Sequence, residues 1–274
     1  MSGADLSGPA PLGLLAAASA AAAAVNAVAG GGTILTFPVL VAILPDGPGR
    51  AVAANATSTI GIWPGSLAAA WAYRGERATL PAWARWLLVP SVIGAAIGVL
   101  LVLQMPPRSF AAAVPWLILL AAVLFAAQPW LQRLVPTAVP DAPGGPSAAG
   151  VMIACAAQLL VAVYGGYFGA GIGILMLAVL GLAGLGDIHR LNGVKNVLAT
   201  VINGVATGMF AAGSALGGHQ VSWTCVAVMA AGSVVGGLAG AAVARRLPAA
   251  TVRRGVAILG FALAAYYLWR SNLG

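Results

Sequence analysis

Long apolar segments, separated by short breaks that hold most of the arginines, constrain this chain more than any other feature of its sequence. A membrane-spanning helix needs about 20 predominantly apolar residues, and segments 51–73, 83–103 and 109–131 all reach that length. Only 7% of the residues are charged, whereas a soluble domain carries roughly 25%. So few charges do not cover a water-soluble surface. We therefore predict an all-α polytopic membrane protein with about eight transmembrane helices.

The positive charge of the chain is concentrated in the breaks. The net charge is +8, from 13 Lys+Arg against 5 Asp+Glu. Arginines in short loops are typical of charges that set membrane orientation, so we do not expect a nucleic-acid partner. If every apolar segment crosses a bacterial inner membrane, a small majority of the arginines faces the cytoplasm and both termini are periplasmic. The first apolar run has no basic region before it, which favours a retained helix over a cleaved signal.

Glycine-rich motifs interrupt the first apolar run of each half of the chain. Residues 12–29 are followed by Gly30-Gly31-Gly32 and a shorter apolar run, and residues 148–168 are followed by GAGIG at 169–173. The first two runs together would make about 50 Å of helix, against a bilayer core of about 30 Å. A broken helix or a re-entrant hairpin fits better than one straight span. Half-helix ends meeting at mid-membrane would attract an anion; close packing through small residues is the alternative.

The two halves of the sequence are related by an internal repeat. SVIGAAIG at 91–98 matches SVVGGLAG at 233–240, and one constant offset aligns Asn55 with Asn192 and Ser58 with Lys195. We predict an N-terminal membrane repeat over 1–135, a Pro/Gly-rich linker over 136–147 and a C-terminal membrane repeat over 148–274. Each repeat would hold four helices with the first one broken, as in many transporters. An even number of spans per half predicts repeats that run parallel.

A polar stripe marks segment 187–207 of the second half. On a helix, Asn192, Asn196, Thr200, Asn203 and Thr207 lie on one face. The only lysine of the chain, Lys195, lies at the edge of that stripe. Such a stripe is costly in hydrocarbon and usually lines a cavity or pathway. Lys195 would then balance the charge of a bound anion; the alternative is an amine that snorkels to the membrane interface.

Three polar residues crowd the start of the same segment: Asp187, His189 and Arg190. They fit either a helix cap with headgroup contacts or a gate, and a histidine titrates near neutral pH. The sequence has no metal-ligand, nucleotide-binding or catalytic motif, and its two cysteines have no CxxC spacing. We therefore expect no enzyme activity, no metal and no cofactor. The carboxylates fall in loops or at segment ends, which disfavours a cation transporter.

Several motifs resemble the TauE/SafE family of membrane transporters, which is named for sulfite or sulfonate export. The resemblance rests on AVAGGGTILTFPVL and AANATST in the first half, and on VYGGYFGAGIGILMLAVLGL, DIHRLNGVKNVLATVINGVA and GSVVGGLAGAAVARRLP in the second. It covers nearly the whole chain. It implies a multi-helix carrier that exports small organosulfur or oxyacid anions, driven by a proton gradient or by the membrane potential.

The expected site combines the glycine-rich breaks with the polar stripes of both halves. The expected substrate-binding residues are Gly31, Gly32, Thr33, Asn55, Ser58, Thr59, Gly169, Gly171, Asn192, Lys195, Asn196 and Asn203. Asp187, His189 and Arg190 are the candidate gate or proton-linked residues. The partners would be a small anion and membrane lipid, with the oligomeric state left open. A passive anion channel and a non-catalytic membrane subunit are the alternatives.

Overall fold

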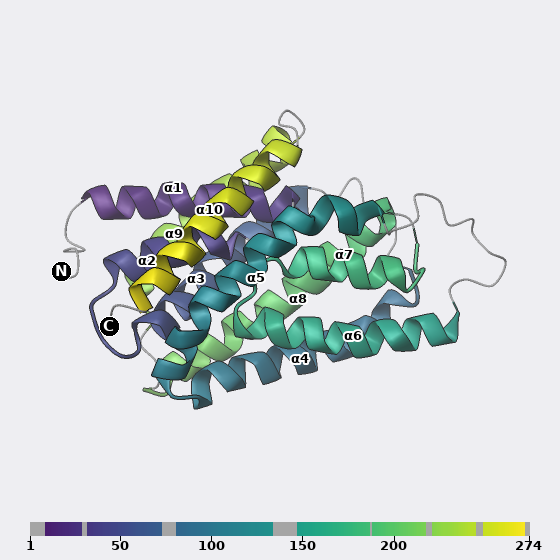
Figure 1. Ribbon diagram of the computed structural model, residues 1–274, viewed down its shortest axis with the longest axis horizontal. Helices are drawn as coiled ribbons and strands as arrows, with labels where there is room; N and C mark the ends of the chain where they lie inside the picture. Colours follow the sequence, from purple (N-terminus) through teal and green to yellow (C-terminus); the bar gives the residue numbers. More distant parts are fainter. Residues whose placement is uncertain are drawn as a thin grey trace.

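The chain folds as a bundle of α-helices, which confirms the all-helical prediction (Figure 1). The computed structural model describes residues 9–28, 32–72, 81–133, 147–186, 188–217, 221–244 and 249–271. No strand occurs within these ranges. The helices of the first half are α1 (Pro9–Val28), α2 (Thr33–Ile43), α3 (Arg50–Ala72), α4 (Ala84–Gln104) and α5 (Pro107–Arg133). Those of the second half are α6 (Ala148–Tyr167), α7 (Ile172–Leu182), α8 (Ile188–Ala215), α9 (Trp223–Ala244) and α10 (Ala249–Ser271).

Both glycine-rich motifs coincide with helix breaks. In the first half the chain turns back, so that α2 packs against α1; a Cβ at Gly32 would lie only 2.1 Å from the carbonyl oxygen of Ala22. In the second half, Gly169 and Gly171 both have φ of +80°, a left-handed conformation that glycine adopts without steric cost. There α7 turns back to pack against α6. Each broken element is therefore a helical hairpin.

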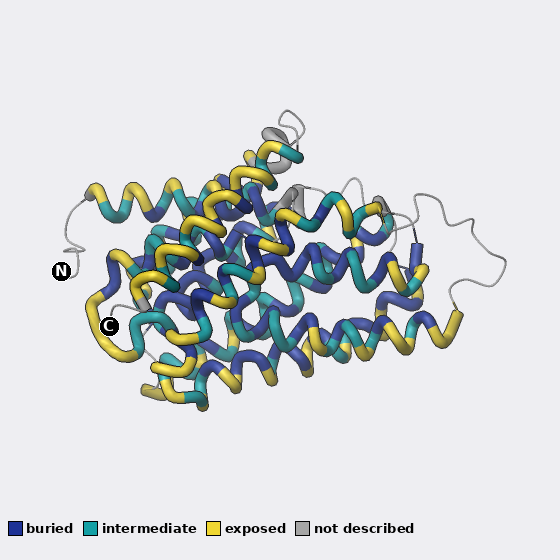
Figure 2. Tube along the Cα trace, viewed as in Figure 1, coloured by how far each residue is buried: buried dark blue, intermediate teal, exposed yellow. Residues whose placement is uncertain are grey.

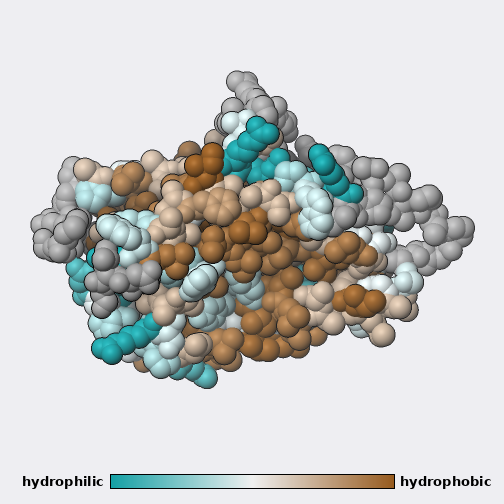
Figure 3. Space-filling model, in the orientation of Figure 1, coloured by the Kyte–Doolittle hydropathy of each residue, from teal (hydrophilic) through white to brown (hydrophobic). Residues whose placement is uncertain are grey.

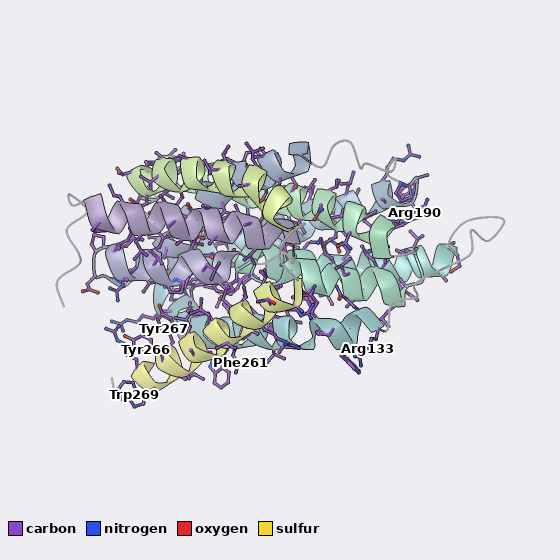
Figure 4. The ribbon with its side chains drawn as sticks, turned by 90° about the horizontal axis from the view of Figure 1, so that it is seen from above. Arg133, Arg190, Phe261, Tyr266, Tyr267 and Trp269 are labelled. Atoms are coloured by element: carbon purple, nitrogen blue, oxygen red, sulfur yellow. The ribbon has the colours of Figure 1, made fainter. Side chains whose placement is uncertain are left out.

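Helices at the same place in the chain order of the two halves run in opposite directions. In Figure 1, α1 starts at the end of the bundle where both termini lie, whereas α6 starts at the opposite end and runs to the middle. Likewise α5 ends at Arg133 on one side and α10 ends beside Trp269 on the other (Figure 4). The predicted parallel relation is wrong, because a hairpin returns the chain to the side it came from. The repeat itself and the count of eight spans stay predictions.

The halves interlock through close backbone contacts. The most extensive helix contacts join α1 with α9 and α4 with α6, so each of these pairs packs a helix of one half against a helix of the other. A Cβ at Gly98 in α4 would lie 2.1 Å from the Val163 carbonyl oxygen, and one at Gly236 in α9 would lie 2.1 Å from that of Ala20. Both glycines belong to the repeated SVIGAAIG and SVVGGLAG motifs. Small residues bring backbones together where lipid supplies no hydrophobic force between helices.

The surface matches a membrane environment. Buried residues fill the centre of the bundle and exposed ones follow its outside (Figure 2). The face shown in Figure 3 carries a broad hydrophobic area across its middle, with hydrophilic residues toward its edges. In the described part of the chain, 4 helices are long and apolar enough to cross a membrane, and shorter apolar helices accompany them. Most of the predicted linker lies outside the described residues; Ser147 at its end caps α6 by accepting a hydrogen bond from Gly150 N–H at 3.1 Å.

The glycine contacts predict a sharp difference between two kinds of glycine substitution. Gly98→Ala and Gly236→Ala should each lower the free energy of unfolding by about 1–3 kcal/mol, because the new methyl group meets backbone atoms. Gly255→Ala in α10 meets no atom within 4 Å and should be neutral or stabilising. Thermal unfolding of the three purified variants in detergent measures the difference. Equal melting temperatures would contradict this account of the interface.

Candidate functional site

Helix α3 is the element that joins the candidate site residues of both halves. Within the first half, Ser58 Oγ lies 2.7 Å from Thr36 Oγ1 of α2. Across the halves, Asn55 Nδ2 donates to the Tyr167 carbonyl at 3.0 Å, at the point where α6 ends. Further along, Trp63 Nε1 donates to the Thr200 carbonyl of α8 at 3.2 Å. We call the region held by these contacts the α3–α8 junction.

Asn55 has an unused acceptor inside the protein. The residue is only 1% exposed, and its Nδ2 is committed to the Tyr167 carbonyl. Its Oδ1 is buried without a hydrogen-bond partner. A buried amide oxygen without a donor is rare in a stable fold and is typical of a position that water or a ligand completes. Thr59 is occupied locally, since its Oγ1 donates to the Asn55 carbonyl at 2.9 Å.

Lys195 lies inside the bundle rather than at its surface. The side chain is 2% exposed, on the same buried face of α8 as Val194 and Leu198. This burial disfavours the snorkelling alternative, which requires an amine that reaches the surface. In the described residues its hydrogen-bond partner is the neutral Asn192 Oδ1, at 3.1 Å, and no carboxylate pairs with it. A buried cation held by a neutral amide is the kind of group that stabilises an anion beside it.

The polar stripe of α8 faces α3 over part of its length. A Cβ at Gly204 would lie 3.2 Å from the Trp63 ring, and the Trp63 indole also bonds Thr200. Asn196 and Asn203 of the stripe are half-buried. The structure therefore brings this part of the stripe against the first half of the chain, whereas Lys195 lies on the more deeply buried side of the helix.

Not every expected glycine offers a backbone donor. Gly31 lies outside the described residues. The Gly32 N–H donates to Asn26 Oδ1 at 2.6 Å, and the Gly169 N–H donates to the Tyr164 carbonyl at 3.2 Å. By contrast, the N–H of Gly171 has no partner in the described part of the chain, and this residue is the N-cap of α7. Gly171 is thus the donor best suited to an anion at a helix N-terminus.

The second break also lies against the first half. Phe168, directly before the glycines, packs edge-on against Phe37 of α2, with ring centroids 5.5 Å apart. Thr33, the first residue of α2, is half-buried, and its carbonyl accepts from Thr36 Oγ1 at 3.4 Å. The apolar contact keeps α2, α3 and the Tyr167–Gly171 turn in one neighbourhood, which is the local environment of Asn55.

Of the expected gate residues, the structure places Arg190, which lies away from this neighbourhood. Asp187 and the side chain of His189 lie outside the described residues. Arg190 lies at one end of the bundle (Figure 4), where it lines a groove with Arg85. No cluster of His, Cys, Asp and Glu suited to a metal occurs among the described residues.

Sequence reasoning missed Thr36, Trp63 and Tyr167 as parts of the junction. Tyr167 contributes a carbonyl, which no side-chain pattern signals. Trp63 could have been found, because the offset that aligns Asn55 with Asn192 also aligns Trp63 with Thr200, the residue it bonds. Thr36 had only a weak signal, a single hydroxyl within the apolar run TILTFP.

A bundle of apolar helices around buried polar groups defines an integral membrane protein. The family described as sulfite exporter TauE/SafE matches residues 15–267, nearly the whole chain, and the chain belongs to this family. Its members are membrane transporters rather than enzymes, which confirms both the predicted resemblance and the expected class. Comparison with curated proteins and with solved structures gave no significant match.

The burial of the only lysine predicts its chemical reactivity. Because Lys195 is 2% exposed, an amine-reactive reagent should modify it slowly in the folded protein and rapidly after denaturation in dodecyl sulfate. Peptide mass spectrometry can follow the modified lysine separately from the N-terminal amine. Rapid modification of folded protein in native membranes would contradict the buried position.

Proposed function

We propose that this transporter exports a small sulfur oxyanion, with sulfite or a short sulfonate as the substrate class. The observation that carries the proposal is the buried ammonium of Lys195, whose partner among the described residues is a neutral amide. An anion beside it would neutralise a charge that is otherwise costly in the membrane interior. The family description supports sulfur oxyanions as the class of substrate.

The proposed site holds the anion with one full charge and several neutral groups. Loss of hydration costs an ion several kcal/mol even after the protein relaxes. Lys195 would supply the compensating charge, and the Gly171 N–H at the start of α7 would add a helix-end donor. Asn55, Ser58, Thr59, Asn192, Asn196 and Asn203 would complete the polar lining, with Gly31, Gly32, Thr33 and Gly169 shaping the breaks. In a protonated oxyanion, the hydroxyl would supply the donor that Asn55 Oδ1 lacks.

We favour the membrane potential as the driving force. Moving one elementary charge across the membrane changes its free energy by about 2.3 kcal/mol per 100 mV. A negative cell interior therefore favours the exit of an anion without any coupled ion. Proton-coupled carriers usually rely on acidic side chains inside the membrane, and none of the described helices contains an aspartate or glutamate.

The orientation we propose follows from the hairpin arrangement. With α1–α2 and α6–α7 as hairpins, three arginines of the described helices, Arg50, Arg108 and Arg270, belong to the end of the bundle that holds the termini. The other arginines of the described helices lie near the helix ends that face the other side: Arg85, Arg133, Arg190, Arg253 and Arg254. Such an imbalance supports a cytoplasmic location of the arginine-rich end. Both termini would then be periplasmic, as the sequence analysis expects, and the membrane would be the bacterial inner membrane.

Transport by lysine variants tests the proposed site. Lys195→Ala should lower saturable sulfite uptake into proteoliposomes by about 10- to 100-fold, the range expected for a lost hydrogen bond to a charged group. Lys195→Arg should restore part of the rate, because it keeps the charge but alters size and geometry. A valinomycin-clamped potassium gradient sets the potential, and an imposed pH gradient at zero potential tests proton coupling.

Arg133→Ala is the matched control, since it removes a positive charge at an exposed helix end. It should transport like the wild type, and all variants should elute as single species in size-exclusion chromatography. Normal uptake by Lys195→Ala would refute the site. Uptake driven only by the pH gradient would refute the coupling, and flux that never saturates would indicate a channel.

The orientation predicts the location of the C-terminus. Alkaline phosphatase fused after the last residue should be active, and a green fluorescent protein fused at the same position should stay dark, because both reporters would lie in the periplasm. A fusion in the linker between α5 and α6 should give the opposite result, because α5 ends and α6 begins at the arginine-rich end. Bright fluorescence from the C-terminal fusion would contradict the proposed orientation.

A further inference from the structure

An open groove at the arginine-rich end of the bundle is separate from the α3–α8 junction. It has a volume of about 750 Å³ and lies where α4, α6 and α8 begin. Among the described lining residues, the side chains other than Arg85 and Arg190 are apolar, and none is a carboxylate. Trp86 and Met152 on its walls are 69% and 70% exposed, so the groove opens to the outside of the bundle.

The groove carries donors that suit a phosphate. Arg85 uses its Nε to bond the Ala82 carbonyl at 3.3 Å, and within the described residues it forms no ion pair. The neighbouring Trp83 is only 8% exposed, yet its indole Nε1 is buried without a hydrogen-bond partner. An unpaired N–H inside a protein is costly, and Trp83 is one of the residues that line the groove. Arg190 supplies a second guanidinium from α8.

The helix backbones add to the positive electrostatic potential of the groove. The groove lies at the N-termini of α4, α6 and α8, which start at Ala84, Ala148 and Ile188. Each helix N-terminus carries about half a positive charge. Three such ends beside two arginines, with no carboxylate among the described lining residues, form an environment that favours a negatively charged group.

We propose that this groove binds an anionic phospholipid, with the phosphodiester at Arg85, Arg190 and Trp83 and the acyl chains along Trp86 and Met152. The apolar, outward-facing walls favour a lipid over a free anion, because a small hydrated anion gains no binding energy from contact with them. Basic pockets between transmembrane helices recognise anionic headgroups in this way. Tryptophan side chains are also enriched at the level of the headgroups.

Native mass spectrometry of the full-length protein in detergent tests the proposal. We expect the wild type to retain phosphatidylglycerol in preference to phosphatidylcholine. Arg85→Gln and Arg190→Gln should each reduce that preference about fivefold, the effect of losing one basic residue near a membrane surface. Trp83→Phe, which keeps the ring but removes the donor, should reduce it by a smaller factor.

Arg133→Gln is the matched control, since Arg133 lies at the same end of the bundle as Arg190 but does not line the groove (Figure 4). It should bind lipid like the wild type. Equal retention of the two lipids would overturn the proposal, as would an equal loss in Arg133→Gln. Displacement of the lipid by inorganic phosphate or sulfite at millimolar concentration would also overturn it, because the groove would then be a site for a free anion.

A cysteine within the groove provides an independent readout. Cys155 lines the groove and is half-buried, whereas Cys225, the other cysteine of the chain, is fully buried. Maleimide should therefore label Cys155 alone, and phosphatidylglycerol in nanodiscs should slow that labelling relative to phosphatidylcholine. Arg85→Gln should abolish the difference between the lipids. Labelling that is insensitive to the headgroup in the wild type would overturn the proposal.

Discussion

Close backbone contact between helices is the constraint on which the rest of this structure depends. Lipid tails are as apolar as leucine side chains, so helices in a membrane gain little from hiding apolar surface and associate through tight packing. Here Gly98 joins α4 to α6, and Gly236 joins α9 to α1, with no room for a Cβ at either position. Each contact joins a helix of one half to a helix of the other, so these contacts hold the two halves together. That framework leaves α3 and α8 in contact with one another.

Helices α3 and α8 differ in the polar groups that they bury. Ser58 in α3 is satisfied by another hydroxyl, that of Thr36. At the matching position of α8 stands Lys195, an ammonium that meets a neutral amide oxygen. Uncharged side chains can satisfy each other inside a protein, whereas a buried cation is costly unless an anion pairs with it. The two helices therefore differ in charge at these positions, with a serine in α3 and a lysine in α8.

The sequence predicts the helices and their breaks well, because hydrophobic runs and glycine motifs act locally. Helix α8 and the interruptions near Gly32 and Gly171 follow from such patterns. The relative direction of the two halves could not be predicted by counting spans, since a hairpin and a crossing helix have the same composition. The hydrogen bond from the Gly32 N–H to Asn26 could not be predicted either, because it depends on how α1 and α2 fold together. The groove had a signal in the WARW sequence at 83–86, two aromatic rings flanking an arginine.

The groove and the surroundings of Lys195 differ in how open they are. Lys195 is enclosed, so the proposed site would admit only an anion small enough to enter without apolar chains. Arg85 and Arg190 stand at an open, apolar rim, where binding energy comes from acyl chains as well as from charge. The groove also spans the first turns of α4 and α6, the helices that Gly98 locks together. A lipid bound there would contact both α4 and α6 and so would stabilise the packing of these two helices. The bilayer itself would then contribute to holding the two halves together.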